Sequence, residues 1–393
     1  MSAGGGAALR PALAIRRLVL TDFRNYRSLD WHPRGRLAVI TGPNGAGKTN
    51  LLEAASLLVP GRGLRGAKLS DIGRRGGPGG FAVAARLTTP EGSLALGTAA
   101  EPGAARRKFL LDGGTPRSQA EIAARVAAVW LTPAMDSLFR DAASARRRFL
   151  DRLVYAFDPG HAREVGAYET AMAGRTRLLA AGGADPAWLA GLEDAMARHG
   201  VAVAAARRAL AGRLAARLGA GAVDPFPRAG IAVACGIGAL LAERPALAAE
   251  ESFRERLARG RREDAAAGAA LSGPHRADLL VTHAAKDLPA SLASTGEQKG
   301  LLVAIVLAHA HLIAEARGAA PLLLLDEPAT HLDAAHREAL YAALLGLPAQ
   351  AWMTGTDPAF FEPLSGRAEV ALAGGGKIVP DPDFPAPETA FLL

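Results

Sequence analysis

Apolar positions change their period along the chain, and the changes predict where strands and helices lie. Short aliphatic and β-branched runs at 14–20 (AIRRLVL) and 37–41 (LAVIT) predict two strands. After Gly42 the apolar residues take a helical spacing through LLEAASLLV. A glycine-rich stretch at 73–80 predicts a loop, and the short runs over about 81–111 predict a small antiparallel sheet built on the first strands.

The pattern becomes helical from about residue 118. Apolar residues recur at helical spacing among arginines between 138 and 154, and again between 189 and 218. Strand patterns return at 278–282, 322–325 and 350–354, and helical patterns at 297–317 and 334–345. An α/β domain interrupted by a helical insertion follows from this order. The expected division is a disordered tail, a discontinuous head, a helical lobe and a C-terminal tail: 1–13; 14–117 and 266–379; 118–265; and 380–393.

Composition narrows the class of protein. Hydrophobic residues make up 50% and charged residues 21%, which excludes wholesale disorder. The net charge of +8 favours a polyanionic partner. The single cysteine, Cys235, excludes an internal disulfide and a cysteine-based zinc site within one chain. Neither a signal-peptide core nor a run of about 18 apolar residues is present, so we expect a soluble cytoplasmic protein with no membrane partner.

Residues 42–49 read GPNGAGKT, which fits the P-loop pattern G-x-x-x-x-G-K-[ST] between a predicted strand and a predicted helix. Glycines there let backbone N–H groups turn inward around phosphate, and the helix N-terminus adds partial positive charge. Lys48 is expected to reach the β- and γ-phosphates, and the Thr49 hydroxyl to ligate Mg²⁺. A glycine turn with an incidental lysine is the plain alternative, which the strand–loop–helix context disfavours. The predicted nucleotide cradle comprises Gly42, Pro43, Asn44, Gly45, Ala46, Gly47, Lys48 and Thr49.

Residues 321–327, PLLLLDE, form a predicted buried strand that ends in two acids. Asp326 is expected to hold Mg²⁺, and Glu327 to polarise the attacking water as the catalytic base. The alternative is a strand end whose acids face solvent, and the presence of a P-loop elsewhere in the chain disfavours it. ATP and Mg²⁺ are therefore the predicted cofactors.

Residues 293–299, ASTGEQK, resemble the signature loop of ABC-type ATPases, with Ala293 in place of the usual leucine. Ser294 and Gly296 precede a long helix, so this loop also offers donors to phosphate. An isolated S-x-G-E is equally a simple helix cap, but its position just before LLLLDE favours the signature. Asp333, in THLD, falls where such ATPases keep their D-loop aspartate. The resemblance implies an ATP-dependent homodimer in which each P-loop faces the partner's signature loop.

Longer strings narrow the family. LVLTDFRNYR precedes the P-loop, GKTNLLEAASLL runs through its helix, and TPAMDSLFRDAASARRRFLDRLV and LSGPHRADL follow. Together with ASTGEQK they resemble the RecF family of DNA replication and repair proteins over about residues 14–372. The sequence departs from the family pattern at Ala277, which replaces the first aspartate of a GPHRDDL block. It departs again at Ala134 and Met135, where the family has Glu-Asp after a proline.

The RecF resemblance implies an α/β, ABC-type P-loop ATPase head, a mixed sheet with flanking helices, and an inserted, mainly helical lobe. It implies a weak, DNA-stimulated ATPase that acts as a switch. The dimer is expected on duplex and gapped DNA at single-strand/double-strand junctions. With RecO and RecR, the family promotes RecA loading, replication restart and SOS induction.

The DNA-contacting residues are harder to predict. Arg146, Arg147 and Arg148 span nearly a full helical turn, so one or two are expected to contact phosphate while others pair with acids. The same alternatives hold for Arg24 and Arg27 in FRNYR. Aromatic residues are scattered, which favours duplex backbone contact over base stacking.

The sequence leaves two other functions as alternatives. The first is the energy-coupling ATPase subunit of a transporter, but the strand at 350–354 is followed by TGTDP without the histidine of such subunits, and the insertion is too long. The second is an ABC-head nuclease, which needs an acidic metal cluster. Asp381 and Asp383 have no companion glutamate pattern.

Overall fold

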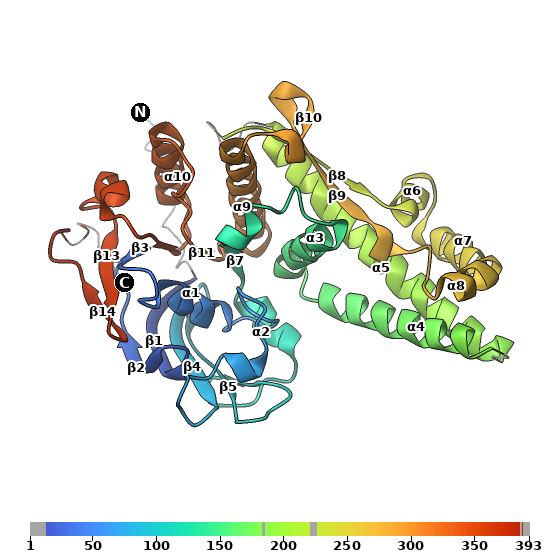
Figure 1. The fold of residues 1–393 in the computed structure, drawn as a ribbon, viewed down its shortest axis with the longest axis horizontal. Coiled ribbons are helices and arrows are strands. Elements are labelled where there is room, and N and C mark those ends of the chain that lie inside the picture. Colours follow the sequence, from blue (N-terminus) through green and yellow to red (C-terminus); the bar gives the residue numbers. More distant parts are fainter. Residues whose placement is uncertain (1–12, 183–184, 221–225, 386, 388–393) are drawn as a thin grey trace, which may run out of the picture. The chain divides into compact units, whose positions relative to one another are not determined.

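The chain folds into two compact units of different character (Figure 1). The first unit comprises the described parts of Met1–Asp136 and Thr295–Leu393 with Phe226, and the second comprises those of Ser137–Ala222 and Pro227–Ser294. The computed structural model describes residues 13–182, 185–220, 226–385 and 387. Apart from Leu13, the tail predicted as disordered lies outside the described residues, as does the end of the predicted C-terminal tail.

A six-stranded sheet forms the centre of the first unit. Its strands in spatial order are β14 (Lys377–Pro380), β13 (Glu369–Gly374), β3 (Leu37–Thr41), β12 (Ala351–Thr354), β11 (Leu322–Leu325) and β7 (Ala128–Leu131). All neighbours pair in parallel except β13 and β14. Strands β3, β11 and β12 are buried along their whole length, as continuous apolar runs in a parallel sheet require. The expected mixed sheet is confirmed.

Helices flank this sheet and are joined to it by short loops. They are α1 (Lys48–Ser56), α2 (Gln119–Arg125), α9 (Thr295–Arg317) and α10 (Ala334–Gly346). Helix α9 is long and apolar enough to cross a membrane by length and composition alone, but 72% of its most apolar window is buried inside the unit. A core helix of a folded domain meets the same criteria of length and composition, and α9 is such a core helix.

The predicted antiparallel sheet is also present in the first unit. Its strands in spatial order are β2 (Tyr26–Trp31), β1 (Ala14–Phe23), β4 (Phe81–Thr89), β5 (Gly92–Ala100) and β6 (Lys108–Leu111). Strand β2 begins at Tyr26, the last residue of FRNY, and runs through a segment for which the sequence pattern predicts no strand. The side chain of Gln350, just before β12, accepts from the backbone N–H of Ile15 at 2.7 Å and donates to its C=O at 3.0 Å, which ties β1 to the parallel sheet at the start of β12.

The second unit is mainly helical, as expected. Its helices are α3 (Ala143–Phe157), α4 (His161–Ala181), α5 (Pro186–Gly219), α6 (Gly236–Glu243), α7 (Ala246–Arg259) and α8 (Arg261–Ala267). An antiparallel sheet of β8 (Ala229–Ala234), β9 (Asp278–His283) and β10 (Leu288–Pro289) completes it. Tyr168, Met196 and Phe253 are buried together where α4, α5 and α7 meet.

The division differs from the predicted one at both boundaries. Residues 128–131 were expected in the lobe, but β7 pairs with β11 in the head sheet. Residues 278–282 were expected in the head, but β9 pairs with β8 in the second unit. The run at 278–282 is a strand as predicted, and only its partner differs. The run at 128–131 is a strand in a region whose pattern predicted helix, so both its conformation and its partner differ. The remaining short helical turns are Leu69–Asp71, Pro133–Met135, Pro274–Arg276, Ala284–Lys286, Ala290–Leu292 and Pro358–Leu364.

Candidate functional site

The loop between β3 and α1 takes a conformation that only glycine tolerates at two positions. Gly42 has φ +135°, and a Cβ there would lie 2.5 Å from the carbonyl oxygen of Ala373. Gly47, at the start of α1, has φ +106°, and a Cβ would lie 2.4 Å from Asn25 Nδ2. Both the positive φ and the close approach exclude side chains, so the backbone of the loop stays accessible.

Lys48 folds back over this loop. Its ammonium donates to the carbonyl oxygens of Gly42 at 2.6 Å and Pro43 at 3.0 Å. Burial lowers the pKa of Lys48, while the nearby carboxylates of Glu327 and Asp326 raise it. Within the described part of the chain the ammonium makes no ion pair at contact distance, so it is available to an incoming phosphate.

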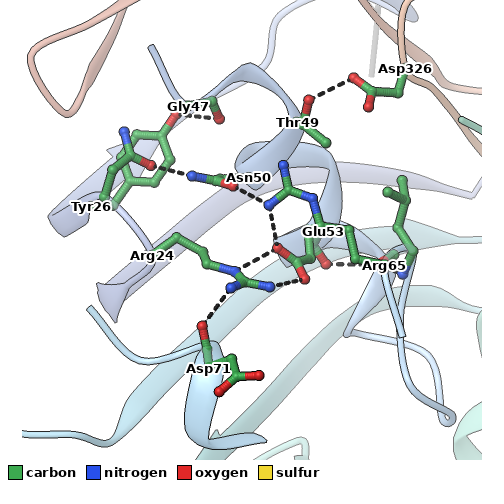
Figure 2. A network of polar contacts seen from close by, with 12 residues as sticks. Arg24, Tyr26, Gly47, Thr49, Asn50, Glu53, Arg65, Asp71 and Asp326 are labelled. Atoms are coloured by element: carbon green, nitrogen blue, oxygen red, sulfur yellow. Dashed lines mark hydrogen bonds and ion pairs between the residues drawn. The ribbon is translucent and has the colours of Figure 1, made fainter. Parts of the chain in front are cut away.

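Asp326, just after β11, is held by two threonine hydroxyls, one from α1 and one from the end of β12. Thr49 Oγ1 donates to Asp326 Oδ1 at 2.8 Å, and Thr354 Oγ1 donates to the same oxygen at 2.7 Å (Figure 2 shows the first contact). Thr354 Oγ1 also accepts from the backbone N–H of Glu327 at 3.0 Å. Glu327 has φ +50°, an uncommon conformation for a non-glycine residue, and this bond helps to hold it.

A cavity of about 120 Å³ opens above the loop. Its lining residues are Asn44, Gly45, Gly47, Lys48, Thr49, Asn50, Arg65 and Glu327. The structure thus brings Gly45, Gly47, Lys48, Thr49 and Glu327 of the predicted site to one cavity. Two of the lining residues, Asn50 and Arg65, were not predicted.

The FRNY segment supports the loop from the side. Phe23 and Tyr26 pair across the tip of the β1–β2 hairpin, which leaves Arg24 and Asn25 in the turn. Asn25 Nδ2 donates to the carbonyl oxygen of Ala46 at 3.1 Å. The hydroxyl of Tyr26 donates to the carbonyl oxygen of Gly47 at 3.1 Å. The motif therefore fixes the backbone of the glycine-rich loop.

A buried carboxylate gathers the cations around α1. Glu53 accepts from Arg24 Nε at 2.8 Å and Nη2 at 2.6 Å, and from Arg65 Nη1 at 3.3 Å (Figure 2). Arg65 Nη1 also donates to Asn50 Oδ1 at 2.6 Å, and Asn50 Nδ2 donates to Asn25 Oδ1 at 2.8 Å. Arg24, one of the residues considered for DNA contact, is thus engaged in holding α1. The sequence offered no signal for Arg65 beyond its charge in a glycine-rich loop.

The residues of the predicted signature loop lie at helix starts. Ser294 is exposed and immediately precedes α9. Gly296, in the first turn of α9, faces the backbone of His331, whose carbonyl oxygen lies 3.5 Å from the position of a Cβ. Asp333 caps α10 by accepting from His336 N at 2.9 Å, and this bond is the main cause of its lowered pKa. Neither Gly296 nor Asp333 lines the cavity above the loop.

A buried lysine marks the segment where two family acids are missing. Lys299, on α9, is 1% exposed and pairs with Asp136 at 2.7 Å. Met135, at one of the two departing positions, is buried. The carboxylate of Asp136, one position after Met135, therefore neutralises the buried ammonium of Lys299. Sequence reasoning missed this pair because the partners lie far apart along the chain.

The three arginines predicted to contact DNA lie on α3 in the second unit and differ in their partners and exposure. Arg146 binds both carboxylate oxygens of Asp278 at 2.7 Å, and these bonds raise its pKa. Arg147 donates to the carbonyl oxygen of Ala277 at 2.7 Å, and burial lowers its pKa. Arg148 is exposed and makes no hydrogen bond or ion pair with the described residues. Arg146 is thus committed to an internal ion pair, and Arg148 is the member that faces solvent.

The GPHR segment has a packing explanation. Gly273 has φ +148°, and a Cβ there would lie 2.1 Å from the hydroxyl of Tyr168. That hydroxyl lies 2.7 Å from His275 Nδ1, and His275 Nε2 lies 2.8 Å from the carbonyl oxygen of Ala270. A carbonyl only accepts, so Nε2 carries the proton and Nδ1 accepts from the tyrosine. Burial lowers the pKa of His275, in keeping with this neutral form.

The parallel sheet, the glycine-rich loop and the acids after β11 define an ABC-type P-loop ATPase head, here with an inserted helical lobe. The family model of the RecF/RecN/SMC N-terminal domain matches residues 14–362. The chain is 50% identical over 372 residues to the DNA replication and repair protein RecF of Mesorhizobium japonicum, covering 94% of this chain and 98% of that protein. It is 47% identical over 369 residues to RecF of Rhizobium etli, covering 93% and 98%. The chain belongs to the RecF family.

Solved structures agree on the fold. A structure of the recombination mediator protein RecF with ATP, described as part of the RecFOR pathway, superposes with a TM-score of 0.82 at 19% identity, over 94% of this chain and 100% of that one. The Smc head domain of Pyrococcus furiosus superposes with a TM-score of 0.52 at 16% identity, over 93% and 96%. The predicted fold class and family are therefore confirmed.

Proposed function

We propose that this chain is an ATP-dependent DNA-binding switch of recombinational repair. It binds ATP with Mg²⁺, dimerises on DNA at single-strand/double-strand gap boundaries, and hydrolyses ATP slowly to release the DNA. The observation that carries the proposal is the cavity above the glycine-rich loop, where Lys48, Thr49 and Glu327 meet. Relatives of about half-identical sequence are named as DNA replication and repair proteins, which sets the biological context.

The residues around the cavity fit a magnesium nucleotide. Mg²⁺ binds through one or two carboxylates plus hydroxyl, water and phosphate oxygens. Thr49 Oγ1 and Asp326 Oδ1, which lie 2.8 Å apart, would hold it. The ion supplies neutralisation of the charge on the β- and γ-phosphate oxygens. Lys48 adds the protein's own positive charge, after exchanging its two carbonyl partners for phosphate oxygens.

Glu327 is the proposed catalytic residue. Its carboxylate lines the cavity, where it would orient and deprotonate the attacking water. Asp326 keeps the buried position next to it because two hydroxyls donate to one of its oxygens. Two adjacent acids thereby take different roles, one towards the metal and one towards water.

The dimer supplies what a single chain lacks. Gly296 and Asp333 do not line the cavity, and donors at the start of a helix suit a partner's phosphate. We propose that Ser294, Gly296 and Asp333 of one chain close over the nucleotide held by the other. Hydrolysis would then separate the two chains, which makes the reaction a switch.

On DNA, we propose that Arg148 contacts phosphate, with Arg147 beside it, and that Arg146 positions the helix through Asp278. With RecO and RecR, the switch would promote RecA loading, replication restart and SOS induction in the cytoplasm. These partners come from the family, and the arginines on α3 are compatible with a duplex backbone.

Sedimentation with and without ATP and gapped DNA tests the proposal. Glu327→Gln should bind ATP and accumulate as a DNA-bound dimer, because a neutral amide cannot accept the proton from water. Lys48→Ala is the matched control and should remain monomeric. A Glu327→Gln protein that stays monomeric with saturating ATP and gapped DNA would contradict the clamp. Hydrolysis at the wild-type rate would remove Glu327 as the base.

A further inference from the structure

A second, larger hollow lies in the first unit, away from the nucleotide cavity. Its volume is about 650 Å³, and it shares no lining residue with the cavity above the glycine-rich loop. Two stretches supply most of its wall: the segment after α1, from Leu57 to Ile72, and the loop between β5 and β6, from Glu101 to Arg107. We call it the α1 groove.

Positive charge dominates the α1 groove. Arg62, Lys68 and Arg106 are exposed lining residues, and none of them makes a side-chain hydrogen bond or ion pair within the described residues. Glu101 is the one acid among the lining residues, and Lys108 pairs with it at 2.6 Å, which lowers the pKa of Glu101. Three cations therefore face the groove without a local counter-charge.

A fourth cation builds the groove itself. Arg107 Nη2 donates to the carbonyl oxygens of Val59 at 2.7 Å and Gly61 at 2.8 Å, just beyond the end of α1. These bonds attach the β5–β6 loop to the segment after α1. The two walls are thus held at a fixed separation, so the exposed cations are presented on a formed surface.

The backbone of the walls is open to an anion. Gly61 has φ +112° and Gly103 has φ +74°, and no atom lies within 4 Å of a Cβ placed on either. Glycine loops of this kind leave main-chain N–H groups accessible to phosphate oxygens. Leu57, Leu69 and Ile72 give the groove an apolar part suited to sugar rings.

We propose that the α1 groove binds the sugar–phosphate backbone of DNA, at a site separate from α3. The cations come from both walls of the groove, Arg62 and Lys68 from one and Arg106 from the other, which suits a chain of phosphates. Contacts of this kind add affinity without sequence preference. The inference rests on the DNA-binding part of the proposed function and adds its location on the head.

The test replaces the three exposed cations together, as Arg62→Gln/Lys68→Gln/Arg106→Gln. Binding to duplex and gapped DNA is measured by fluorescence anisotropy over a range of salt. Each lost phosphate contact should reduce the salt slope by about 0.9, and weaken binding about fivefold at 0.15 M salt. The triple variant should therefore bind on the order of a hundredfold more weakly.

The matched control is Arg34→Gln/Arg86→Gln/Lys377→Gln, which removes three exposed cations of the same unit from outside the groove. Both triple variants should keep the wild-type circular dichroism spectrum and ATP affinity. If the groove variant and the control lose DNA affinity and salt slope equally, the inference is wrong. If wild-type protein shows no salt-dependent DNA binding at all, the proposed function is wrong and the groove inference is wrong with it.

A small anion is the other source of the same chemistry. Inorganic tripolyphosphate is titrated by calorimetry into a Lys48→Ala background, in which the nucleotide loop is impaired. Tripolyphosphate binding that the three groove substitutions abolish, together with unchanged DNA binding, would overturn the DNA assignment in favour of a small polyphosphate. Competition between DNA and tripolyphosphate for the groove would support the DNA assignment.

Discussion

Thr354 is the residue whose replacement most directly tests how the two acids after β11 are held. It is fully buried, and its hydroxyl donates to Asp326 Oδ1 at 2.7 Å while accepting from Glu327 N at 3.0 Å. Thr354→Val keeps the β-branched shape that suits β12 and removes only the hydrogen-bonding capacity. Both acids are affected at once, from a position that lines no part of the cavity.

The expected decrease in kcat follows from the strained backbone of Glu327 and the one hydrogen bond that offsets this strain. Glu327 sits at φ +50°, a conformation that costs a non-glycine residue about 1–2 kcal/mol. The bond from its N–H contributes about 0.5–1.5 kcal/mol, which is comparable. Without the acceptor, the turn is free to relax and the carboxylate leaves its working position for most of the time. A loss of about 1.4 kcal/mol corresponds to a tenfold decrease in kcat.

ATP affinity should change much less than kcat. Asp326 keeps its bond from Thr49 at 2.8 Å, and Lys48 and the glycine-rich loop are untouched. The assay is therefore kcat by a coupled ATPase measurement and the ATP Kd by calorimetry. Thr354→Ser retains the hydroxyl and is the matched control, with kcat close to that of the wild type.

Two outcomes would refute this reasoning. Thr354→Val with wild-type kcat would mean that the hydroxyl does not position Glu327. A serine variant as impaired as the valine variant would mean that packing of the γ-methyl group, and not hydrogen bonding, is what matters.

Three further predictions concern other parts of the chain. Lys48→Ala should weaken ATP binding by at least tenfold in calorimetry, because the phosphates lose their charged partner; unchanged binding would remove the P-loop assignment. Ser294→Arg should keep ATP binding but abolish dimerisation, and mixing it with Lys48→Ala should restore part of the ATPase activity through one intact composite site. No restoration at any ratio would mean either that both sites must work together or that the signature loop acts in cis; crosslinking of mixed dimers tells these apart, and a cis signature would contradict the trans arrangement. Gly273→Ala should destabilise the second unit by about 2 kcal/mol or more, because its Cβ meets the Tyr168 hydroxyl, whereas Gly268→Ala, at φ +64° in open space, should cost less; denaturant melts compare the two.

The local parts of the site were predictable from the sequence. The glycine-rich loop, its lysine and the acids after LLLL are set by neighbours in the chain, because a strand, a turn and a helix start fix their geometry. Residues that act through distant partners were not. Thr354 bonds Asp326 across 28 positions and Lys299 pairs with Asp136 across 163, and no periodicity marks either contact.

The same reason explains the misplaced boundaries. The strand at 278–283 was predicted as a strand, since apolar runs bounded by turn residues report local conformation. The strand at 128–131 lies in a region that the pattern predicted to be helical, and its conformation is set by pairing with β11. Which sheet a strand joins depends on the edge that is open to it, and that edge belongs to another segment. A short apolar run can therefore indicate strand conformation, but it does not indicate which sheet the strand joins.

The net charge of +8 takes on a different meaning once the cations are located. Arg175 is 1% exposed and bound to Glu193 and Asp264, so its charge is cancelled inside the second unit. Arg146 and Arg24 are likewise held by carboxylates. A sum over the sequence counts these residues equally with those that face solvent. The polyanion must instead be met by exposed cations without a local counter-charge. Arg148 on α3 and the three residues of the α1 groove are among the residues that meet this criterion. The two surfaces can be separated experimentally, because each loses its contribution to the salt slope only when its own cations are removed.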